Sequence, residues 1–275
     1  MPDPTDDHKY VVQILARAMR VLFDLASRAE PRRLEELAAD HDVSKASLLR
    51  ILRTLELDGV VLREGDGYRL GPRVLDLGYG YLSNLELDQV ARPHLRQLAE
   101  ATDQTVSLAV LDGLDVVYIA IEKARRELGI LGEIGGRHPA NATALGKVLL
   151  ADLDEAALAR LLDGAELPRL THRTLFEPSA LTSHLIRVRQ QGYALDDEER
   201  GIGIRCVAVP IHDATGNVVA GVSVAGAIFH MSDETIAEHR ELVLRAAAAI
   251  SKRLGYDPAR EREPRREDRE ATPAG

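Results

Sequence analysis

The stretch between residues 42 and 71 constrains the fold of this chain more than any other part of the sequence. Leucines and an isoleucine recur at helical spacing from Leu48 to Leu55, and they predict the apolar face of a helix. Ser44 suits the N-cap of that helix, because its side-chain oxygen can accept a hydrogen bond from a free amide of the first turn. Gly59 suits the position after the last turn, where a positive φ is common.

A predicted β-hairpin follows the helix. Two apolar runs, 60–62 and 68–70, flank a segment that ends in Gly-Asp-Gly, and such a segment is typical of a turn between paired strands. A helix followed by a hairpin with a basic side chain near its tip predicts a winged helix-turn-helix, whose helix can enter the major groove of DNA. The alternative is an ordinary helix packed beside a hairpin. The predicted DNA contacts are Ser44, Lys45, Ser47 and Arg50 at the bases, with Arg53 and Arg63 nearer the phosphates.

Upstream segments complete the order that a helix-turn-helix requires. Apolar residues recur at helical spacing from about 8 to 29, and a short second helix is predicted at 34–39, before a turn at 40–43. The first helix carries more apolar positions than a single three-helix domain can bury. We therefore expect part of it to pack against a second subunit, which makes the protein a homodimer.

The remainder of the chain predicts an α+β domain, reached through a helix-like linker that opens at Pro72 and contains weakening glycines. Apolar runs bounded by turn residues predict two antiparallel hairpins and one short strand, and helical periodicity predicts the helices that cover them. The predicted strands are 105–111, 116–121, 193–195, 206–211 and 218–226, and the predicted helices are 94–99, 142–153, 154–162, 178–191 and 236–254.

The predicted organisation has four parts. Residues 8–71 form the winged helix-turn-helix, 72–88 the linker helix, and 89–256 a domain of the kind that binds a small effector. Residues 257–275 alternate arginine with acidic residues and carry no large apolar side chain, so we predict a disordered tail.

Composition excludes several classes of protein. A net charge of −9 argues against nonspecific coating of DNA, but it leaves room for a small basic face. The single cysteine excludes an intramolecular disulfide and a cysteine-rich zinc site. No signal peptide opens the sequence, and no stretch approaches the ~20 apolar residues of a membrane span. We therefore expect a soluble, cytoplasmic protein without a membrane partner.

Enzyme motifs are incomplete in this sequence. The segment 221–225 ends in alanine and predicts a strand, so it does not form a nucleophile elbow. The segment 201–203 lacks the third glycine of a dinucleotide-binding fingerprint, and the histidines lack metal-binding spacing. We expect no catalysis, no cofactor and no metal.

Together, the order of segments and a set of short motifs resemble the IclR family of bacterial transcriptional regulators. The resemblance runs from about residue 11 to residue 255, and it is specific because the motifs keep their order and spacing. The stretches that carry it are 14–22, 52–55, 68–71, 135–137, 142–147, 192–193, 196–199 and 204–208.

The resemblance implies an N-terminal winged helix-turn-helix, a linker helix and a C-terminal domain similar to GAF folds. It also implies dimers, often paired into tetramers, on double-stranded operator DNA. We predict a repressor whose operator binding is modulated by a small effector, and the residues leave activation open. The alternative function is a ligand sensor that acts through protein contacts without binding DNA.

The effector site is predicted partly from the residues and partly from the resemblance. Asn141 is the predicted N-cap of a helix that begins near Ala142, and free amides at such a helix start favour an anion such as a carboxylate. Ala225 stands where relatives carry a second serine, which makes the pocket more apolar. The resemblance implies effector contacts at Ile130, Ala144, Leu145, Asp196, Cys206 and Ser223.

These residues predict a small organic acid with a second polar group and an apolar middle, such as a hydroxylated aromatic acid. Each also has a purely structural interpretation. Cys206 can be a small buried apolar residue, Ser223 can bond to a neighbouring backbone, and the acidic run 196–199 can be a solvated loop.

Overall fold

The computed structural model describes residues 11–28, 30–77, 86–123 and 132–258. The chain divides into two compact units, Met1–Asn84 and Leu85–Gly275. Several predicted features lie outside the described residues, namely residues 78–85 of the linker helix, Ile130 and the tail beyond residue 258. The predicted domain boundaries therefore stay predictions.

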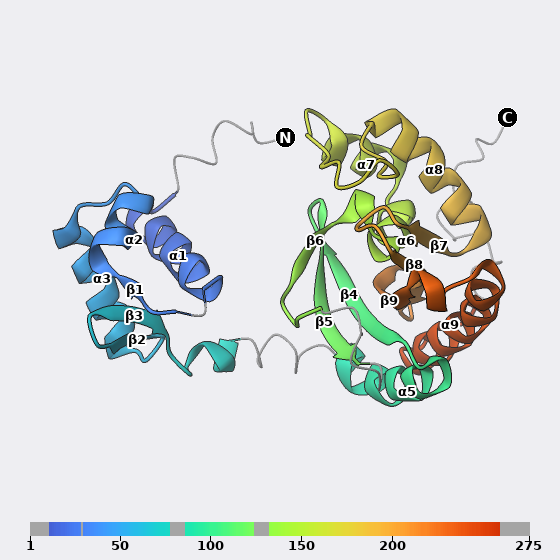
Figure 1. The fold of residues 1–275 in the computed structure, drawn as a ribbon, viewed down its shortest axis with the longest axis horizontal. Helices are drawn as coiled ribbons and strands as arrows, with labels where there is room; N and C mark the ends of the chain where they lie inside the picture. Colours follow the sequence, from blue (N-terminus) through green and yellow to red (C-terminus); the bar gives the residue numbers. More distant parts are fainter. Residues whose placement is uncertain (1–10, 29, 78–85, 124–131, 259–275) are drawn as a thin grey trace, which may run out of the picture. The chain divides into compact units, whose positions relative to one another are not determined.

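The N-terminal unit packs three helices against a small antiparallel sheet (Figure 1). Apolar side chains from all three helices and from the hairpin meet in one core, which includes Val21, Leu37, Leu52 and Tyr68. The sheet has the strand order β1-β3-β2. The elements are α1 (Gln13–Ala26), β1 (Arg32–Arg33), α2 (Leu34–Asp40), α3 (Lys45–Leu57), β2 (Val61–Glu64) and β3 (Gly67–Leu70).

Local chemistry sets the ends of α3 where the sequence predicts them. The Ser44 side-chain oxygen accepts a hydrogen bond from the Ser47 amide at 3.3 Å. Gly59 follows the last turn with φ +70°. The two-residue strand β1 was not predicted; Arg32 anchors it through ion pairs to Asp24 on α1 and Asp40 on α2.

Helix α1 is shorter than predicted, and one side of it faces solvent in this unit. Val21 and Leu25 point into the core. The exposed apolar side chains on α1 and just before it are Val11, Val12, Ile14, Leu15, Met19 and Phe23.

The C-terminal unit is built on one six-stranded antiparallel sheet, in the order β6-β5-β4-β9-β8-β7. The two predicted hairpins are therefore halves of a single sheet, because β4 pairs with β9. The short edge strand β6 was not predicted. The strands are β4 (Thr105–Asp112), β5 (Asp115–Glu122), β6 (Arg137–Pro139), β7 (Ala194–Asp197), β8 (Ile204–His212) and β9 (Val218–Ala227).

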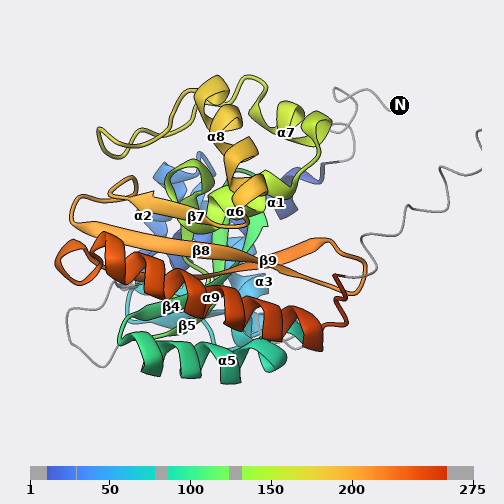
Figure 2. The same cartoon turned by 90° about the vertical axis from the view of Figure 1, so that its right-hand side faces the viewer.

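Helices cover both faces of this sheet, so the predicted α+β class is confirmed (Figures 1 and 2). One face carries α5 (Glu86–Thr102) and α9 (Asp233–Arg253), which lie side by side. The other face carries α6 (Ala144–Asp152), with α8 (Pro178–Gln191) packed on it and α7 (Glu155–Leu162) nearby. Two short 3-10 turns, Ala140–Ala142 and Ile228–His230, complete the unit.

Strands β4 and β9 divide their side chains between the two helical layers, since successive residues of a strand point to opposite faces. Ser107 and Ser223 face the α6 side, whereas Val106, Val222 and Val224 are fully buried on the α5 and α9 side. Both faces of the central sheet are thus covered.

Helix α6 is almost entirely buried. It approaches the preceding turn so closely that a Cβ at Gly146 would lie 2.2 Å from the Cα of Ala140. Only glycine fits this contact, which accounts for the glycine in this buried helix. Among the described residues, no helix is long and apolar enough to cross a membrane.

Candidate functional site

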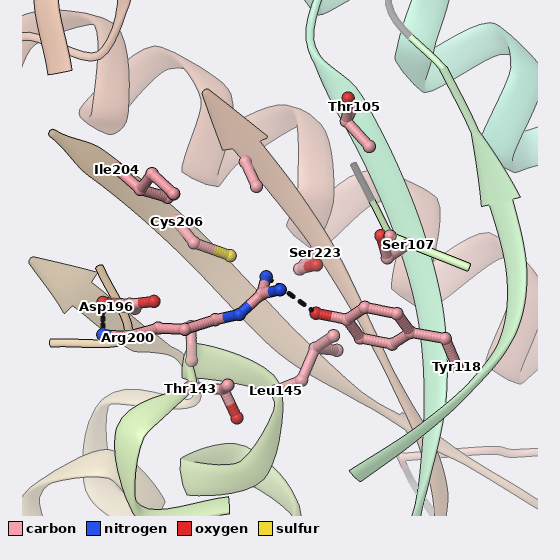
Figure 3. Close-up of a pocket in the computed structure, with 13 residues that line it drawn as sticks. Thr105, Ser107, Tyr118, Thr143, Leu145, Asp196, Arg200, Ile204, Cys206 and Ser223 are labelled. Carbon is pink, nitrogen blue, oxygen red and sulfur yellow. Dashed lines mark hydrogen bonds between the residues drawn. The ribbon is translucent and has the colours of Figure 1, made fainter. Parts of the chain in front are cut away.

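A small cavity lies between α6 and the sheet of the C-terminal unit (Figure 3). The structure brings five of the six predicted effector residues to its wall, and Ala225 joins them. The sixth, Ile130, lies outside the described residues. The five come from α6, β7, β8 and β9: Ala144, Leu145, Asp196, Cys206 and Ser223.

Strand register explains why residues so far apart in sequence meet here. Asp196 lies opposite Cys206, Cys206 opposite Ala225, and Ala225 opposite Thr105, which makes one row across four strands. A second pair, Ser107 opposite Ser223, lies beside this row. The wall is therefore a continuous patch of small and polar side chains.

Sequence reasoning missed several residues of the wall. Tyr118 and Arg200 are the largest of them, and their side chains meet across the cavity in Figure 3. Arg200 directly follows the acidic run 196–199. A single basic residue at the end of an acidic run was the only sequence signal that could have identified Arg200 as a candidate. The other missed residues are Thr105, Ser107, Gly132, Thr143 and Ile204.

The start of α6 differs from the prediction. Asn141 is not the N-cap; its side-chain amide donates to the carbonyl oxygens of Pro168 and Leu175 at 3.0 and 2.8 Å. Thr143 is the N-cap instead, and its hydroxyl oxygen accepts from the Gly146 amide at 3.0 Å. The prediction was wrong because both residue types cap helices, and the 3-10 turn at Ala140–Ala142 shifts the start.

The cavity wall includes the first two residues of α6. Within the described residues, the amides of Ala144 and Leu145 have no hydrogen-bond acceptor. A helix start also carries a partial positive charge, so this end of the cavity favours an acceptor or an anion.

Asp196 brings a buried carboxylate to the cavity and is only 3% exposed. Its Oδ1 accepts hydrogen bonds from the amides of Glu199 and Arg200 at 2.8 and 3.2 Å. Burial raises the pKa of Asp196 to about 6, against the smaller lowering effect of these amides and of Lys147. The interpretation of 196–199 as a solvated loop is wrong, because Glu199 is buried as well.

Lys147 and Glu199 hold the acidic run in place. The Lys147 side chain is fully buried, and its Nζ lies 2.5 Å from Glu199 Oε1. Burial raises the pKa of Glu199 above its ordinary value, and Lys147 opposes this shift. The Thr174 hydroxyl donates to the Glu199 carbonyl oxygen at 2.6 Å, so the run is fixed from two sides.

Arg200 extends across the cavity from the end of this run. Its Nη1 lies 3.5 Å from the Tyr118 hydroxyl, and its Nη2 lies 3.0 Å from His138 Nε2. No carboxylate of the described residues lies within the 4.0 Å of an ion pair with it. The free volume of the cavity beside Arg200 is only about 20 Å³, which is room for about one water molecule.

Cys206 contributes a neutral thiol. It is buried between Asp196 and Ser223 on the wall, and burial raises its pKa to about 12. The thiol is therefore protonated at neutral pH. It gives the wall a small, weakly polar surface and is not a nucleophile.

The predicted DNA contacts lie on α3, at its N-cap and on β2. Ser47 is partly buried, and the other five are exposed. Lys45 pairs with Glu35 at 3.2 Å, and Arg53 pairs with Glu56 at 3.0 Å. Arg63 Nε donates to the Gly65 carbonyl oxygen at 3.3 Å. Arg50 has no side-chain partner in the described part of the chain, so its guanidinium is available to an external acceptor.

No group of three or more His, Cys, Asp or Glu side chains in the described part of the chain could hold a metal ion.

Residues 79–252 match the family model described as "Bacterial transcriptional regulator IclR C-terminal". The chain is 36% identical over 250 residues to the HTH-type transcriptional regulator XynR of Escherichia coli K12, covering 90% of this chain and 98% of XynR. It is 32% identical over 248 residues to the transcriptional repressor IclR of the same strain, with 89% and 90% covered. These relatives are transcriptional regulators and not enzymes, as predicted for this chain.

A solved structure with a bound ligand is also similar. It is an IclR homolog from Microbacterium hydrocarbonoxydans complexed with 4-hydroxybenzoate, 26% identical, with a TM-score of 0.77. The match covers 88% of this chain and 98% of that one.

Proposed function

Because the chain belongs to the IclR family of bacterial transcriptional regulators, we propose that it represses transcription at an operator and that a small organic acid modulates its binding. The observation that carries the effector half is the convergence of five predicted residues, from four elements, on one cavity. Operator DNA lies in the bacterial cytoplasm, so the proposal includes that location.

The DNA-binding half of the proposal is a winged helix-turn-helix. Helices α2 and α3 are joined by a short turn, and the β2–β3 hairpin follows α3, in the order that this motif requires. Arg50 has no competing partner among the described residues, which suits contact with a base edge. Arg63 on the hairpin suits a phosphate. The other proposed contacts are Ser44, Lys45, Ser47 and Arg53.

A homodimer is part of the proposal. Val11, Leu15, Met19 and Phe23 recur every four residues and form an exposed apolar stripe along α1. An apolar stripe of this kind is typical of a surface that a second subunit covers. Two DNA-binding helices in a dimer would contact half-sites about 34–36 Å apart, or a multiple of that. Pairing of dimers into tetramers on DNA remains the alternative.

The effector is proposed to be a small organic acid with a hydroxyl group. The amides at the start of α6 favour an acceptor, whereas Asp196 favours a donor, so one ligand must present different groups to them. Cys206, Leu145 and Ala225 supply the apolar part of the wall. The 4-hydroxybenzoate bound by the Microbacterium homolog has this combination of groups.

Two measurements test the proposal. A gel shift with the promoter region of the protein's own gene should show a specific complex that competitor DNA does not remove. A thermal-shift screen of organic acids should find one that stabilises the protein, because a ligand at 100 times its Kd adds about 2.7 kcal/mol. That acid should then weaken or strengthen the complex in the gel.

Each half of the proposal can fail by itself. Acid binding without any specific DNA complex would favour the alternative, a sensor that acts through protein contacts. A specific DNA complex that no acid alters would remove the effector from the proposal.

A further inference from the structure

Among the described residues of the cavity wall, Arg200 alone carries a full positive charge, and both hydrogen-bond partners of its guanidinium are uncharged side chains. Its guanidinium nitrogens meet the Tyr118 hydroxyl and His138 Nε2, both of which are uncharged groups. Burial lowers the pKa of His138 to about 4 and raises that of Tyr118 to about 12, so neither titrates near neutral pH. Arg200 is partly buried, yet no carboxylate of the described residues pairs with it.

The direction of these hydrogen bonds leaves donors for a ligand. A guanidinium can only donate, so the Tyr118 oxygen and His138 Nε2 accept from Arg200. The phenolic proton of Tyr118 is therefore available to a second acceptor in the cavity. A carboxylate placed here would receive N–H donors from Arg200 and an O–H donor from Tyr118.

The energetic comparison with the start of α6 favours Arg200 as the site of the acid group. A helix start behaves as about half a positive charge, whereas a guanidinium carries a full one and can bind both carboxylate oxygens. A partly buried cation that no carboxylate of the described residues neutralises is also unfavourable, and a ligand carboxylate would remove that penalty. The larger charge of the guanidinium and the removal of this penalty both favour binding of the carboxylate at Arg200.

We propose that Arg200 and Tyr118 form the anion subsite of the cavity and bind the carboxylate of the effector. This inference rests on the proposed function and refines it. The guanidinium extends across the cavity to Tyr118 in Figure 3, so we expect it to turn from His138 toward the carboxylate when an acid enters.

The other end of the ligand then follows from the remaining wall. A hydroxyl group is both an acceptor and a donor, so it can accept from the amides of Ala144 and Leu145 and donate to Asp196. This assignment removes the conflict between an acid group and the nearby Asp196 carboxylate. Thr105 lies on the same wall, and its buried hydroxyl oxygen has no partner within the described chain, which leaves one more polar group for a ligand.

The test compares acids with their uncharged amides. The full-length protein is titrated by calorimetry with 4-hydroxybenzoate, benzoate, 3-hydroxybenzoate and 3-hydroxybutyrate, and with the primary amide of each. Arg200→Gln should weaken binding of an acid by about 10- to 100-fold, the loss expected for a charged hydrogen bond. It should change binding of the matching amide by less than about 3-fold.

Three controls make the result specific. Arg200→Lys keeps the charge and should recover part of the affinity. Arg187→Gln removes an exposed arginine on α8, outside the cavity wall, and should leave acid binding unchanged. Tyr118→Phe should weaken acid binding less than Arg200→Gln does, and the melting temperature of each variant shows whether it is folded.

The outcomes separate the two proposals. An acid that binds wild-type protein and the Arg200→Gln variant equally would overturn the anion subsite and leave the proposed function standing. If none of the four acids binds the wild-type protein, the effector class in the proposed function fails, and the subsite fails with it.

Discussion

Each unit of this protein contains a lysine–glutamate pair, and the two pairs could hardly differ more in surroundings. Lys45 and Glu35 join α3 to α2 at 3.2 Å with 61% and 62% of their side chains exposed. Lys147 and Glu199 join α6 to the loop after β7 at 2.5 Å with 0% and 10% exposed. Water screens the charges of the first pair. In the buried pair, each charge is neutralised mainly by the other member of the pair.

This difference holds for the two candidate sites as a whole. The proposed DNA contacts are exposed except for the partly buried Ser47, and they lie within twenty positions of each other, from Ser44 to Arg63. The cavity residues are buried or partly buried and range from Thr105 to Ala225. Changes at the exposed arginines Arg50 and Arg63 should therefore alter binding with little effect on stability, whereas changes around the cavity should alter both.

The largest expected effect is on stability. Lys147→Met removes the charge and leaves Glu199 buried without its partner, so the free energy of unfolding should fall by about 3–5 kcal/mol. Lys45→Met should leave the urea midpoint nearly unchanged, because both members of that pair are exposed. Urea denaturation followed by circular dichroism measures the free energy of unfolding of both variants. Equal losses of stability in Lys147→Met and Lys45→Met would contradict the difference between the buried and the exposed pair.

The next effect depends on pH. Asp196 has a pKa of about 6 in the folded protein against an ordinary value of 3.8, so folding takes up a proton between those values and wild-type stability is lost as pH rises through them. Asp196→Asn cannot ionise, so its stability relative to wild type should rise by roughly 2 kcal/mol between pH 4 and pH 7. A stability difference that stays flat over this range would show that Asp196 is hydrated rather than buried.

A smaller effect is expected on DNA binding. Arg50→Ala should weaken operator binding by about 1–3 kcal/mol and relax base preference, because its side chain is free to contact a base. Arg63→Ala should weaken operator and random DNA alike. Competition gel shifts at fixed salt separate these patterns, and a change in melting temperature for either variant would contradict the surface assignment.

The smallest effect is expected at Ser223. Ser223→Ala removes one neutral hydroxyl from the wall, so acid binding should weaken by about 0.5–1.5 kcal/mol. This loss should be smaller than that of Arg200→Gln in the same titration. A larger loss would mean that Ser223, and not Arg200, holds the charged end of the ligand.

Sequence alone predicted the features that depend on residues close together in the chain, such as the ends of helices. Ser44 caps α3, Gly59 ends it with a positive φ, and Gly192 ends α8 in the same way. The α+β class followed from apolar periodicity, and the cavity positions on the strands followed from family resemblance. The role of these positions in binding is still a prediction.

What sequence could not predict depends on contacts made by the folded chain. Thr143 and Asn141 are both good caps, and only the turn packed against Gly146 selects between them. Arg200 and Tyr118 are 82 positions apart, and only the strand register and the buried Lys147–Glu199 pair bring their side chains together. Strands β1 and β6 are too short to show an alternating pattern.

The alternation of β4 and β9 has a mechanical consequence. Ser107 and Ser223 line the cavity, and the next residues on the same strands, Val106 and Val222, press on the layer that contains α5 and α9. An effector in this cavity would thus be separated from α5 by the thickness of one polypeptide backbone, and a close-packed interior has little free space to absorb a displacement. Since α5 begins only two residues after the N-terminal unit ends, a strand displaced by the proposed effector would push on the part of the C-terminal unit that is nearest in sequence to the proposed DNA-binding unit.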